Sequence, residues 1–317
     1  MYYTIGGFTL DETVLPNGKV QSAAPGGNVL YSAIGAKIWG VPVGLISPIG
    51  NNYPNEYLEL LRRNGFDLEG VNRIDHPSFY VWILHEGDGK RQIIYRLNSG
   101  SNVFLDPGIK DIPNECLNAK GALICPIRGD SQRVIANYLI EHHVPLFLDL
   151  IVIPGQIDVN LIQNKDMWGK LKSFMPSIEE VRAIFGSKPL WELLKEMEMI
   201  SPKCFVIKLG HNGSLLRNPV DGCYYHIPIY PCEAIDATGA GDSYCGGFMV
   251  GLQEKNDPIE AALQGSVSAS FLIEDFGAMH ALKITSEMGQ ERLEKIRLKV
   301  RQLNKVEIEK IESLISN

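Results

Sequence analysis

The chain has 317 residues, of which 45% are hydrophobic, and its 30 lysines and arginines are outnumbered by 37 aspartates and glutamates, giving a net charge of −7. This acidic balance, without a basic stripe, argues against a nucleic-acid-binding protein, so we expect no nucleic-acid partner. A mean hydropathy of −0.03 together with the hydrophobic fraction predicts a sizeable buried core and argues against intrinsic disorder.

The sequence has no run of about 18 apolar residues, and its start lacks the basic and apolar segments of a signal peptide. Its six cysteines are scattered without Cys-x-x-Cys spacing, which is typical of reduced, mostly buried thiols and not of a zinc site or a disulfide framework. We therefore expect a cytoplasmic protein with no membrane partner.

The N-terminal half alternates strands with helices, except for two hairpins. Residues 9–24 are predicted to form the first hairpin, because Asn17 and Gly18 lie between two extended segments. Residues 78–98 are predicted to form the second, because both arms are rich in β-branched and aromatic residues and flank a Gly-Asp-Gly turn. Around the hairpins we expect strands at residues 2–8 and 41–46 and helices at residues 28–39 and 53–64.

The alternation continues in the C-terminal half. We expect strands at residues 121–126, 146–150, 173–175 and 204–209, helices at residues 132–141, 178–185, 190–199, 243–252 and 259–271, and a charged helix at residues 286–311 on the outside of the sheet. This order predicts a single α/β domain over residues 1–317, with a three-layer α/β/α Rossmann-like core and a mostly parallel sheet. The two hairpins are well placed to form a small β-sheet lid over the active site.

The most informative segment is residues 236–242, Asp-Ala-Thr-Gly-Ala-Gly-Asp, which runs directly into a helix-like stretch. The backbone N–H groups of Gly239, Ala240 and Gly241 would converge at the positive end of that helix and hold an anion. Asp242 beside such an anion hole would accept the proton of an alcohol during phosphoryl transfer. The plainer interpretation is a turn followed by an N-cap aspartate.

With Asp236, Thr238, Gly239, Gly241 and Asp242 in one register, the chain resembles the ribokinase-like (PfkB) family of carbohydrate and nucleoside kinases, whose signature is Asp-Thr-x-Gly-Ala-Gly-Asp. The resemblance covers the chain from the first strand to residues 277–278. It implies a Rossmann-like core with a lid, an ATP- and Mg²⁺-dependent transfer to a hydroxyl of a small sugar-like acceptor, and a homodimer through the lid. It also implies that Asp236 and Thr238 help to form a K⁺ site.

Acceptor-binding candidates lie in the N-terminal half. The segment Pro-Gly-Gly-Asn at residues 25–28 is a common turn with an N-cap, but the resemblance implies that Gly26, Gly27 and Asn28 contact the sugar. Asp11 could bridge two vicinal hydroxyl groups, or it could be a solvated charge of the hairpin. Arg96, like Arg128, is a candidate partner for an anionic or polyhydroxy acceptor, with an ordinary surface arginine as the alternative.

Nucleotide-binding candidates follow the strand at residues 204–209. Lys208, Gly210 and Gly213 are predicted to belong to a loop that lets a nucleotide approach the backbone. An ordinary turn between two strands would have the same sequence pattern. The resemblance implies that this loop lies beside the ATP phosphates and ribose.

Ala237 replaces the first Thr of the signature, and three further positions depart from the family. Its Asn-x-x-Glu segment, in which the Glu is linked to hydrated Mg²⁺, reads Ser177-x-x-Glu180 here, which is also a complete capping box. Ser266 stands where several members have an adenine-side Asn, and Tyr31 replaces a further Asn of the first helix, which hints at a different acceptor pocket. Two alternatives to a sugar kinase therefore stay open: a nucleoside or vitamin-precursor kinase, and a catalytically weak binding or regulatory protein.

Overall fold

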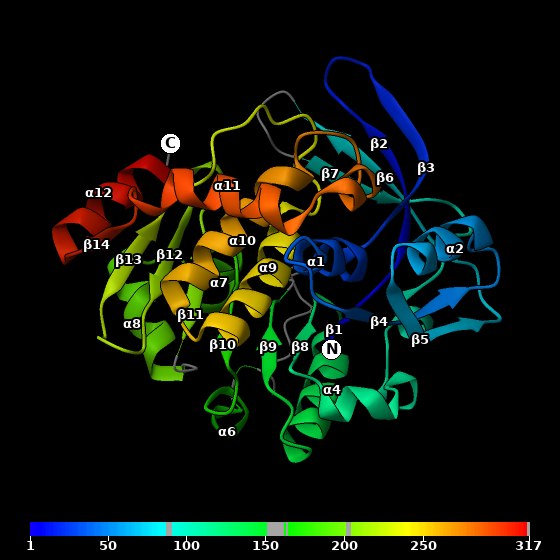
Figure 1. The fold of residues 1–317 in the computed structure, drawn as a ribbon, viewed down its shortest axis with the longest axis horizontal. Coiled ribbons are helices and arrows are strands. Elements are labelled where there is room, and N and C mark those ends of the chain that lie inside the picture. Colours follow the sequence, from blue (N-terminus) through cyan, green and yellow to red (C-terminus); the bar gives the residue numbers. More distant parts are fainter. Residues whose placement is uncertain (87–90, 151–161, 163, 201–203, 316–317) are drawn as a thin grey trace.

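A ten-stranded sheet forms the centre of the computed structural model, which describes residues 1–86, 91–150, 162, 164–200 and 204–315. Its strand order is β14-β13-β12-β11-β10-β9-β8-β1-β4-β5 (Figure 1). All pairings from β5 to β11 are parallel, whereas those from β11 to β14 are antiparallel. The strands are β1 Tyr2–Ile5, β4 Val43–Gly50, β5 Phe66–Ile74, β8 Gly121–Ile124, β9 Leu146–Leu148, β10 Ser173–Phe174, β11 Phe205–Lys208, β12 Ser214–Arg217, β13 Tyr224–Ile227 and β14 Arg301–Leu303.

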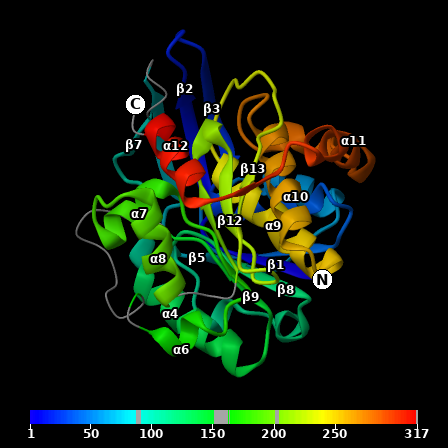
Figure 2. The ribbon, with the colours of Figure 1, turned by 90° about the vertical axis from the view of Figure 1, so that its left-hand side faces the viewer.

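Helices cover both faces of this sheet, and Figure 2 shows the resulting layers edge-on. The strands alternate between two hydrophobic cores, since Tyr2 packs into one and its neighbour Tyr3 into the other. The first core includes side chains of α1 Asn28–Lys37, α2 Asn55–Arg63, α9 Ala240–Lys255, α10 Pro258–Leu272 and α11 Ser286–Arg297. The second includes side chains of α4 Gly129–Glu141, α6 Lys165–Trp168, α7 Ile178–Phe185, α8 Leu190–Ile200 and α12 Lys305–Ile315, and a short helix, α3 Asn102–Leu105, precedes β8.

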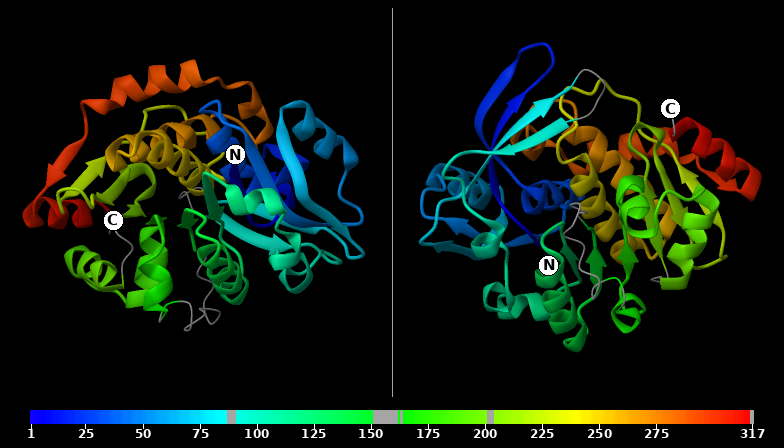
Figure 3. Two further views of the ribbon diagram at one scale, coloured as in Figure 1. Left: turned by 60° about the horizontal axis from the view of Figure 1, so that its bottom comes forward. Right: turned by 180° about the vertical axis from the view of Figure 1, so that it is seen from behind.

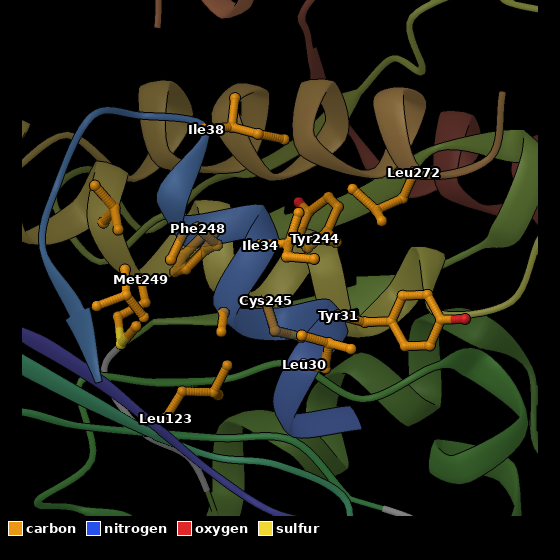
Figure 4. Close-up of a cluster of buried hydrophobic side chains, with 14 of the residues drawn as sticks. Leu30, Tyr31, Ile34, Ile38, Leu123, Tyr244, Cys245, Phe248, Met249 and Leu272 are labelled. Atoms are coloured by element: carbon orange, nitrogen blue, oxygen red, sulfur yellow. The ribbon is translucent and has the colours of Figure 1, made fainter. Parts of the chain in front are cut away.

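Helices α1 and α9 pack unusually closely (Figure 4). A Cβ atom added to Gly246 would lie 1.9 Å from the carbonyl oxygen of Ser32, and one added to Gly35 would lie 2.2 Å from that of Ser243. Glycine at these positions therefore lets the two backbones touch, which fixes the start of α9 relative to the sheet.

The two predicted hairpins form a separate four-stranded sheet of order β3-β2-β6-β7, which we call the lid. It contains β2 Thr9–Val14, β3 Val20–Gly26, β6 Phe79–His85 and β7 Arg91–Tyr95, and the predicted Gly-Asp-Gly turn at residues 87–89 lies outside the described residues. The hairpins join through the parallel pair β2 and β6. Figure 3 shows the lid projecting beyond the layered core. The predicted fold class, a layered α/β core with a small second sheet, is confirmed.

The structure differs from the sequence-based prediction at the edges of the sheet. The single helix predicted at residues 286–311 is wrong, because β14 interrupts it by pairing with β13 and separates α11 from α12. Strand β5 was not predicted, because charged residues on its exposed face interrupt the apolar run of an edge strand. The antiparallel extension β12 to β14 was likewise not predicted.

All six cysteines are free, and four of them are buried. Not one helix in the described ranges combines the length and apolar character that a membrane crossing demands.

Candidate active site

The start of α9 is shaped by glycine. Gly239 caps the helix with φ 76°, and a Cβ atom at this position would lie 2.1 Å from the ring of Tyr31. The first helical hydrogen bond runs from Ser243 N to Gly239 O, while Ala240 N donates to Ala237 O at 3.3 Å. The amides of Gly241 and Asp242 therefore precede the helical ladder, and they lie at the positive end of α9.

A cavity of about 190 Å³ opens between this helix start and the lid, and we call it the acceptor cavity because Asp11, Gly27 and Asn28, the residues expected to bind an acceptor, line it. Its core side presents Asn28, Tyr31, Thr238, Gly239 and Asp242. Its lid side combines the polar Thr9 and Asp11 of β2 with a row of apolar and aromatic side chains, namely Phe79, Val81, Ile83, Ile93 and Tyr95. The cavity therefore has a polar part, made by its core side together with Thr9 and Asp11, which we call the floor. It also has an apolar part, made by the row from Phe79 to Tyr95, which we call the roof.

Asp11 and the Gly-Gly-Asn segment meet at this floor. Asp11 is buried and accepts a hydrogen bond from Thr9 Oγ1 at 2.5 Å, and a Cβ atom on Gly26 would overlap its carboxylate. Gly27 has φ 101° and lies against the backbone of Gly7. Asn28 lines the cavity, but its side chain also accepts from Gly7 N at 2.9 Å and donates to Pro126 O at 2.5 Å, so it joins three segments around the floor.

Asp106 is a further carboxylate of this cavity that the sequence gave no reason to select, because it lies in an irregular segment after α3. Burial raises the pKa of Asp106 to about 6. The hydrogen bond that its Oδ2 accepts from Arg128 N at 3.2 Å acts in the opposite direction and lowers this pKa. The guanidinium of Arg128 pairs with Asp130 at 2.5 Å.

The structure does not bring Arg96 to the acceptor cavity. Its guanidinium lies 4.0 Å from the ring of Tyr80 and 3.3 Å from Glu12 Oε1. Tyr80 and Glu12 alternate with the cavity-lining residues of β6 and β2, so this cluster lies on the face of the lid away from the cavity, which we call its outer face and where Tyr80 packs against the first core.

A second cavity, of about 340 Å³, opens on the other side of the same helix start, and we call it the nucleotide cavity. It is lined by four of the nucleotide-binding candidates, Lys208, Gly210, Gly213 and Ser266, and by Ala240 and Gly241, whereas the fifth candidate, Ser177, does not line it. A Cβ atom on Gly213, which has φ 82°, would lie 2.2 Å from Ile227 O, so only glycine fits there. The Ser266 hydroxyl donates to Pro228 O at 2.6 Å, and most of the remaining lining is apolar.

A buried lysine connects the second cavity to the helix start. Lys208 Nζ lies 2.5 Å from Asp149 Oδ2, and it would lie 3.4 Å from a Cβ atom placed on Gly241. Burial opposes the charge of Lys208 most strongly, but Asp149, Cys245 and Glu180 together outweigh it and hold the pKa of the ammonium well above its ordinary value. The sequence offered a signal for Asp149, a carboxylate directly after the buried strand β9 at the carboxyl edge of a parallel sheet.

Glu180 lies in the same charged cluster. Its Oε2 accepts from Ser177 N at 2.6 Å while Ser177 Oγ accepts from Glu180 N at 3.3 Å, so the predicted capping box is formed. Burial and the neighbouring Asp149 raise the pKa of Glu180 to about 7, although Lys208 lowers it. The buried carboxylate of Asp149 and the half-buried carboxylate of Glu180 thus lie near one ammonium group.

Asp236 and Thr238 lie just before the helix start. Asp236 is 1% exposed; its Oδ1 accepts from Thr238 N at 2.9 Å, and its Oδ2 accepts from Gly277 N at 3.4 Å. His85, the last residue of β6, places Nε2 3.2 Å from Asp236 Oδ1 and 3.4 Å from Thr238 Oγ1. No feature of the sequence had indicated His85.

The two cavities meet at residues 237–242, since Thr238, Gly239 and Asp242 line one while Ala237, Ala240 and Gly241 line the other. Such a junction can hold a transferable anionic group between two bound molecules, with a carboxylate on one side and backbone amides beneath.

The sequence pattern of the pfkB family carbohydrate kinases matches residues 3–285 of this chain. A cytidine kinase from Thermococcus kodakarensis is 25% identical over 264 residues, which are 82% of this chain and 91% of the relative. A ribokinase from Bacillus subtilis is 25% identical over 286 residues, covering 88% of this chain and 90% of the relative.

Among solved structures, a putative ribokinase II from E. coli in complex with ATP and Mg²⁺ has a similar fold, with a TM-score of 0.76 and 17% identity. The similarity covers 93% of this chain and 99% of that one.

Proposed function

The chain belongs to the pfkB family of carbohydrate kinases, and from that premise we propose that it transfers the γ-phosphoryl group of ATP to a hydroxyl group of a small sugar-like acceptor. The observation that carries this proposal is the shared junction of the two cavities at residues 237–242. ATP would enter from the nucleotide cavity and the acceptor from the acceptor cavity, so that the reacting atoms meet at the start of α9.

Asp242 is the proposed general base. It lines the acceptor cavity in the first turn of α9, where it can take the proton of the attacking hydroxyl group. The acceptor oxygen then forms a bond to the γ-phosphorus, the bond between that phosphorus and the bridging oxygen of ATP breaks, and ADP leaves. The amides of Gly241 and Asp242 would stabilise the charge on the phosphoryl group during the transfer.

Lys208 is the proposed cationic partner of the phosphates. Its ammonium group lies beside Gly241 and borders the nucleotide cavity, while Asp149 holds it in place. Because its pKa stays high, the ammonium group remains protonated beside the phosphates.

The charged cluster also fits Mg²⁺. Magnesium is usually held by one or two carboxylates together with substrate phosphates and water. The described residues contain no group of three or more His, Cys, Asp or Glu side chains that could hold a metal ion, and a magnesium site of this kind does not need one. Glu180 and Asp149 would hold the ion, and their unbalanced negative charge is what a cation would relieve. When bound with ATP, Mg²⁺ neutralises charge on the β- and γ-phosphates, and a structural neighbour contains both.

A nucleoside is the second candidate acceptor, and the apolar roof favours it. The ribose diol would lie on Asp11, while a planar base would pack against Phe79, Ile93 and Tyr95. A free pentose or hexose would leave this apolar surface without a partner. Both a cytidine kinase and a ribokinase stand among the relatives, which supports either class.

The test is ADP formation from Mg·ATP with a panel of pentoses, hexoses, sugar acids, polyols and nucleosides, measured for the wild type and for Asp242→Asn. We expect turnover with one acceptor class and a loss in kcat of about 10²- to 10⁴-fold in the variant. Turnover that survives the substitution would contradict the role of Asp242. Thermal stabilisation by ATP without turnover on any acceptor would instead support a binding or regulatory protein.

A further inference from the structure

Tyr230 gives the nucleotide cavity an aromatic side chain, and it lines the cavity together with the apolar Ile229 and Ile273. Arg292 and Lys295, both on α11, lie over its ring, with the guanidinium 4.6 Å and the ammonium nitrogen 6.0 Å from the ring centre. Neither of these cations lines the cavity. Helix α11 therefore covers the ring from the side away from the cavity and leaves the rest of its surface to a bound molecule.

The contacts of Arg292 hold this ring in place. Its guanidinium donates two hydrogen bonds to the carboxylate of Glu274, at 2.9 and 2.7 Å, and lies 3.6 Å from the ring centre of Phe271. A guanidinium fixed at both ends and lying over Tyr230 restrains the aromatic ring by a cation–π contact. A ring that is already in position loses little conformational freedom when a flat molecule stacks on it.

The buried polar side chains of the lining are bonded within the protein. The hydroxyl groups of Ser266 and Ser270 donate to backbone carbonyl oxygens at 2.6 and 2.7 Å. The Tyr244 hydroxyl lies 2.9 Å from that of Ser214, and the thiol of Cys232 donates to a further backbone carbonyl oxygen at 3.6 Å. Because a serine hydroxyl has one proton, Ser266 and Ser270 have none left to donate to a base.

The other polar side chains of this lining are suited to other tasks. Lys208 is the proposed partner of the phosphates, and His211 is exposed, with Nε2 3.2 Å from the side-chain nitrogen of Asn212. A tyrosine hydroxyl such as that of Tyr230 can donate or accept, so it does not distinguish an amino group from a carbonyl group. Among the described side chains that line the cavity, stacking and apolar contact are therefore the means of holding a base.

We propose that the nucleotide cavity holds the base of the phosphate donor by stacking on Tyr230 and apolar packing, without recognising its hydrogen-bonding edge, so that ATP, GTP and ITP all serve as donors. A site built to hydrogen-bond a substrate group rejects an analogue without it by about 10⁴- to 10⁵-fold, whereas an apolar pocket discriminates by about 10²-fold or less. Stacking tolerates different bases, because every base has a π face. The triphosphate, which Lys208 and the amides of Gly241 and Asp242 would hold, is the same in all three donors.

This inference rests on the proposed kinase activity, and steady-state kinetics with the magnesium complexes of ATP, GTP and ITP test it. In the wild type we expect kcat/KM values that agree within about tenfold. Tyr230→Ala should raise the KM of all three donors by about tenfold, because it removes the stacking surface. Tyr225→Ala is the matched control: Tyr225 is also a half-buried tyrosine, its hydroxyl donates to Asp221 at 2.6 Å, and it lines neither cavity. It should leave all three KM values unchanged.

Ser266→Ala examines the one buried hydroxyl oxygen that needs a separate test. Although the proton of Ser266 is donated to Pro228 O, its oxygen retains a lone pair that can accept from an amino group. ATP carries such an amino group on its base and ITP does not. If Ser266 does not recognise the base, the substitution changes the KM of ATP and of ITP by the same factor.

Calorimetric titration without an acceptor gives a readout that is independent of turnover. The Kd values of Mg·ADP, Mg·GDP and Mg·IDP should agree within about tenfold, and magnesium pyrophosphate, which has no base, should bind at least about tenfold more weakly.

Four results would each overturn the proposal: a preference for one base greater than about tenfold, an ATP-to-ITP ratio that Ser266→Ala changes, a Tyr230→Ala variant with unchanged KM values, or pyrophosphate that binds as tightly as ADP. If the three diphosphates bind alike but no acceptor is phosphorylated, the proposed function fails while this inference stands. If none of them binds, both fail.

Discussion

The two walls of the acceptor cavity are built by different means. The core wall comes from contiguous backbone at residues 238–242 and from the closely packed helices α1 and α9, and its shape is set by glycines with no room for a side chain. The lid wall comes from alternating side chains of β2, β6 and β7, which lie far apart in the sequence and are partly exposed. The core wall is therefore intolerant of change, whereas the lid wall can change its lining without moving its backbone.

This difference assigns reaction and specificity to different regions. Backbone amides and a helix start can stabilise a phosphoryl group whatever the acceptor is. The identity of the acceptor depends on the side chains that meet its far end, and these belong to the lid. Three substitutions examine that division, and the two in the cavity walls each have a matched control.

The largest effect is expected for Gly239→Ala. Gly239, with φ 76° and ψ 2°, is left-handed, so alanine there incurs a backbone cost of about 1–2 kcal/mol. Gly186, with φ 86° and ψ 170°, lies in a region open essentially to glycine alone, so alanine there incurs about 1–3 kcal/mol. Only at Gly239 would the new Cβ atom overlap a neighbour, the ring of Tyr31 at 2.1 Å, whereas nothing lies within 4 Å at Gly186. We expect Gly239→Ala to lower kcat by at least about 10²-fold, through the displaced amides.

Urea unfolding and steady-state kinetics of both glycine variants check this prediction. Gly186→Ala should lose stability by the backbone cost alone and keep its kcat. Similar kcat values in the two variants would mean that the core wall adapts as readily as the lid wall, which would break the comparison.

The same division explains which features of the molecule could be predicted from its sequence. The fold and the reaction could be predicted because their signals are local: alternating strands and helices, two turn-flanked hairpins, and one heptapeptide at residues 236–242. Asp149 could also have been selected, since it follows a buried parallel strand. Asp106 and His85 could not, because they reach the site only when an irregular segment and a lid strand fold against the core. Arg96 was selected by its charge alone, and strand alternation placed it on the outer face.

A smaller effect is expected on the lid wall, where two neighbouring isoleucines of β7 point to opposite faces. Ile93 lines the acceptor cavity and Ile94 does not, although both are about half exposed, at 51% and 45%. Ile93→Ala should raise the KM for the acceptor by about tenfold with little change in kcat, because it removes apolar contact from the bound molecule.

Ile94→Ala should leave the KM unchanged, and sedimentation of both variants shows whether the homodimer expected through the lid is altered. A nucleoside acceptor would make the KM effect of Ile93→Ala larger than a free sugar would, since the base meets the roof. A fall in kcat as large as that of Gly239→Ala would mean that the lid wall also takes part in the chemistry.

The smallest effect concerns the charge of Asp106. Because folding raises the pKa of this carboxyl group from 3.8 to about 6, the folded state holds its proton more tightly than the unfolded chain does. The stabilisation that comes from this tighter proton binding is therefore present in full below pH 3.8, the pKa of the unfolded chain, and is lost as the pH rises through about 6. The free energy of unfolding consequently falls between these two pH values. Asp106→Asn removes this slope and should raise the free energy of unfolding relative to the wild type at pH 7, by on the order of 1 kcal/mol, while leaving it similar at pH 4. Chemical denaturation across that range measures the difference. A constant offset at every pH would mean that Asp106 is solvated like an ordinary surface carboxylate, and that this part of the acceptor cavity is wetter than its packing indicates.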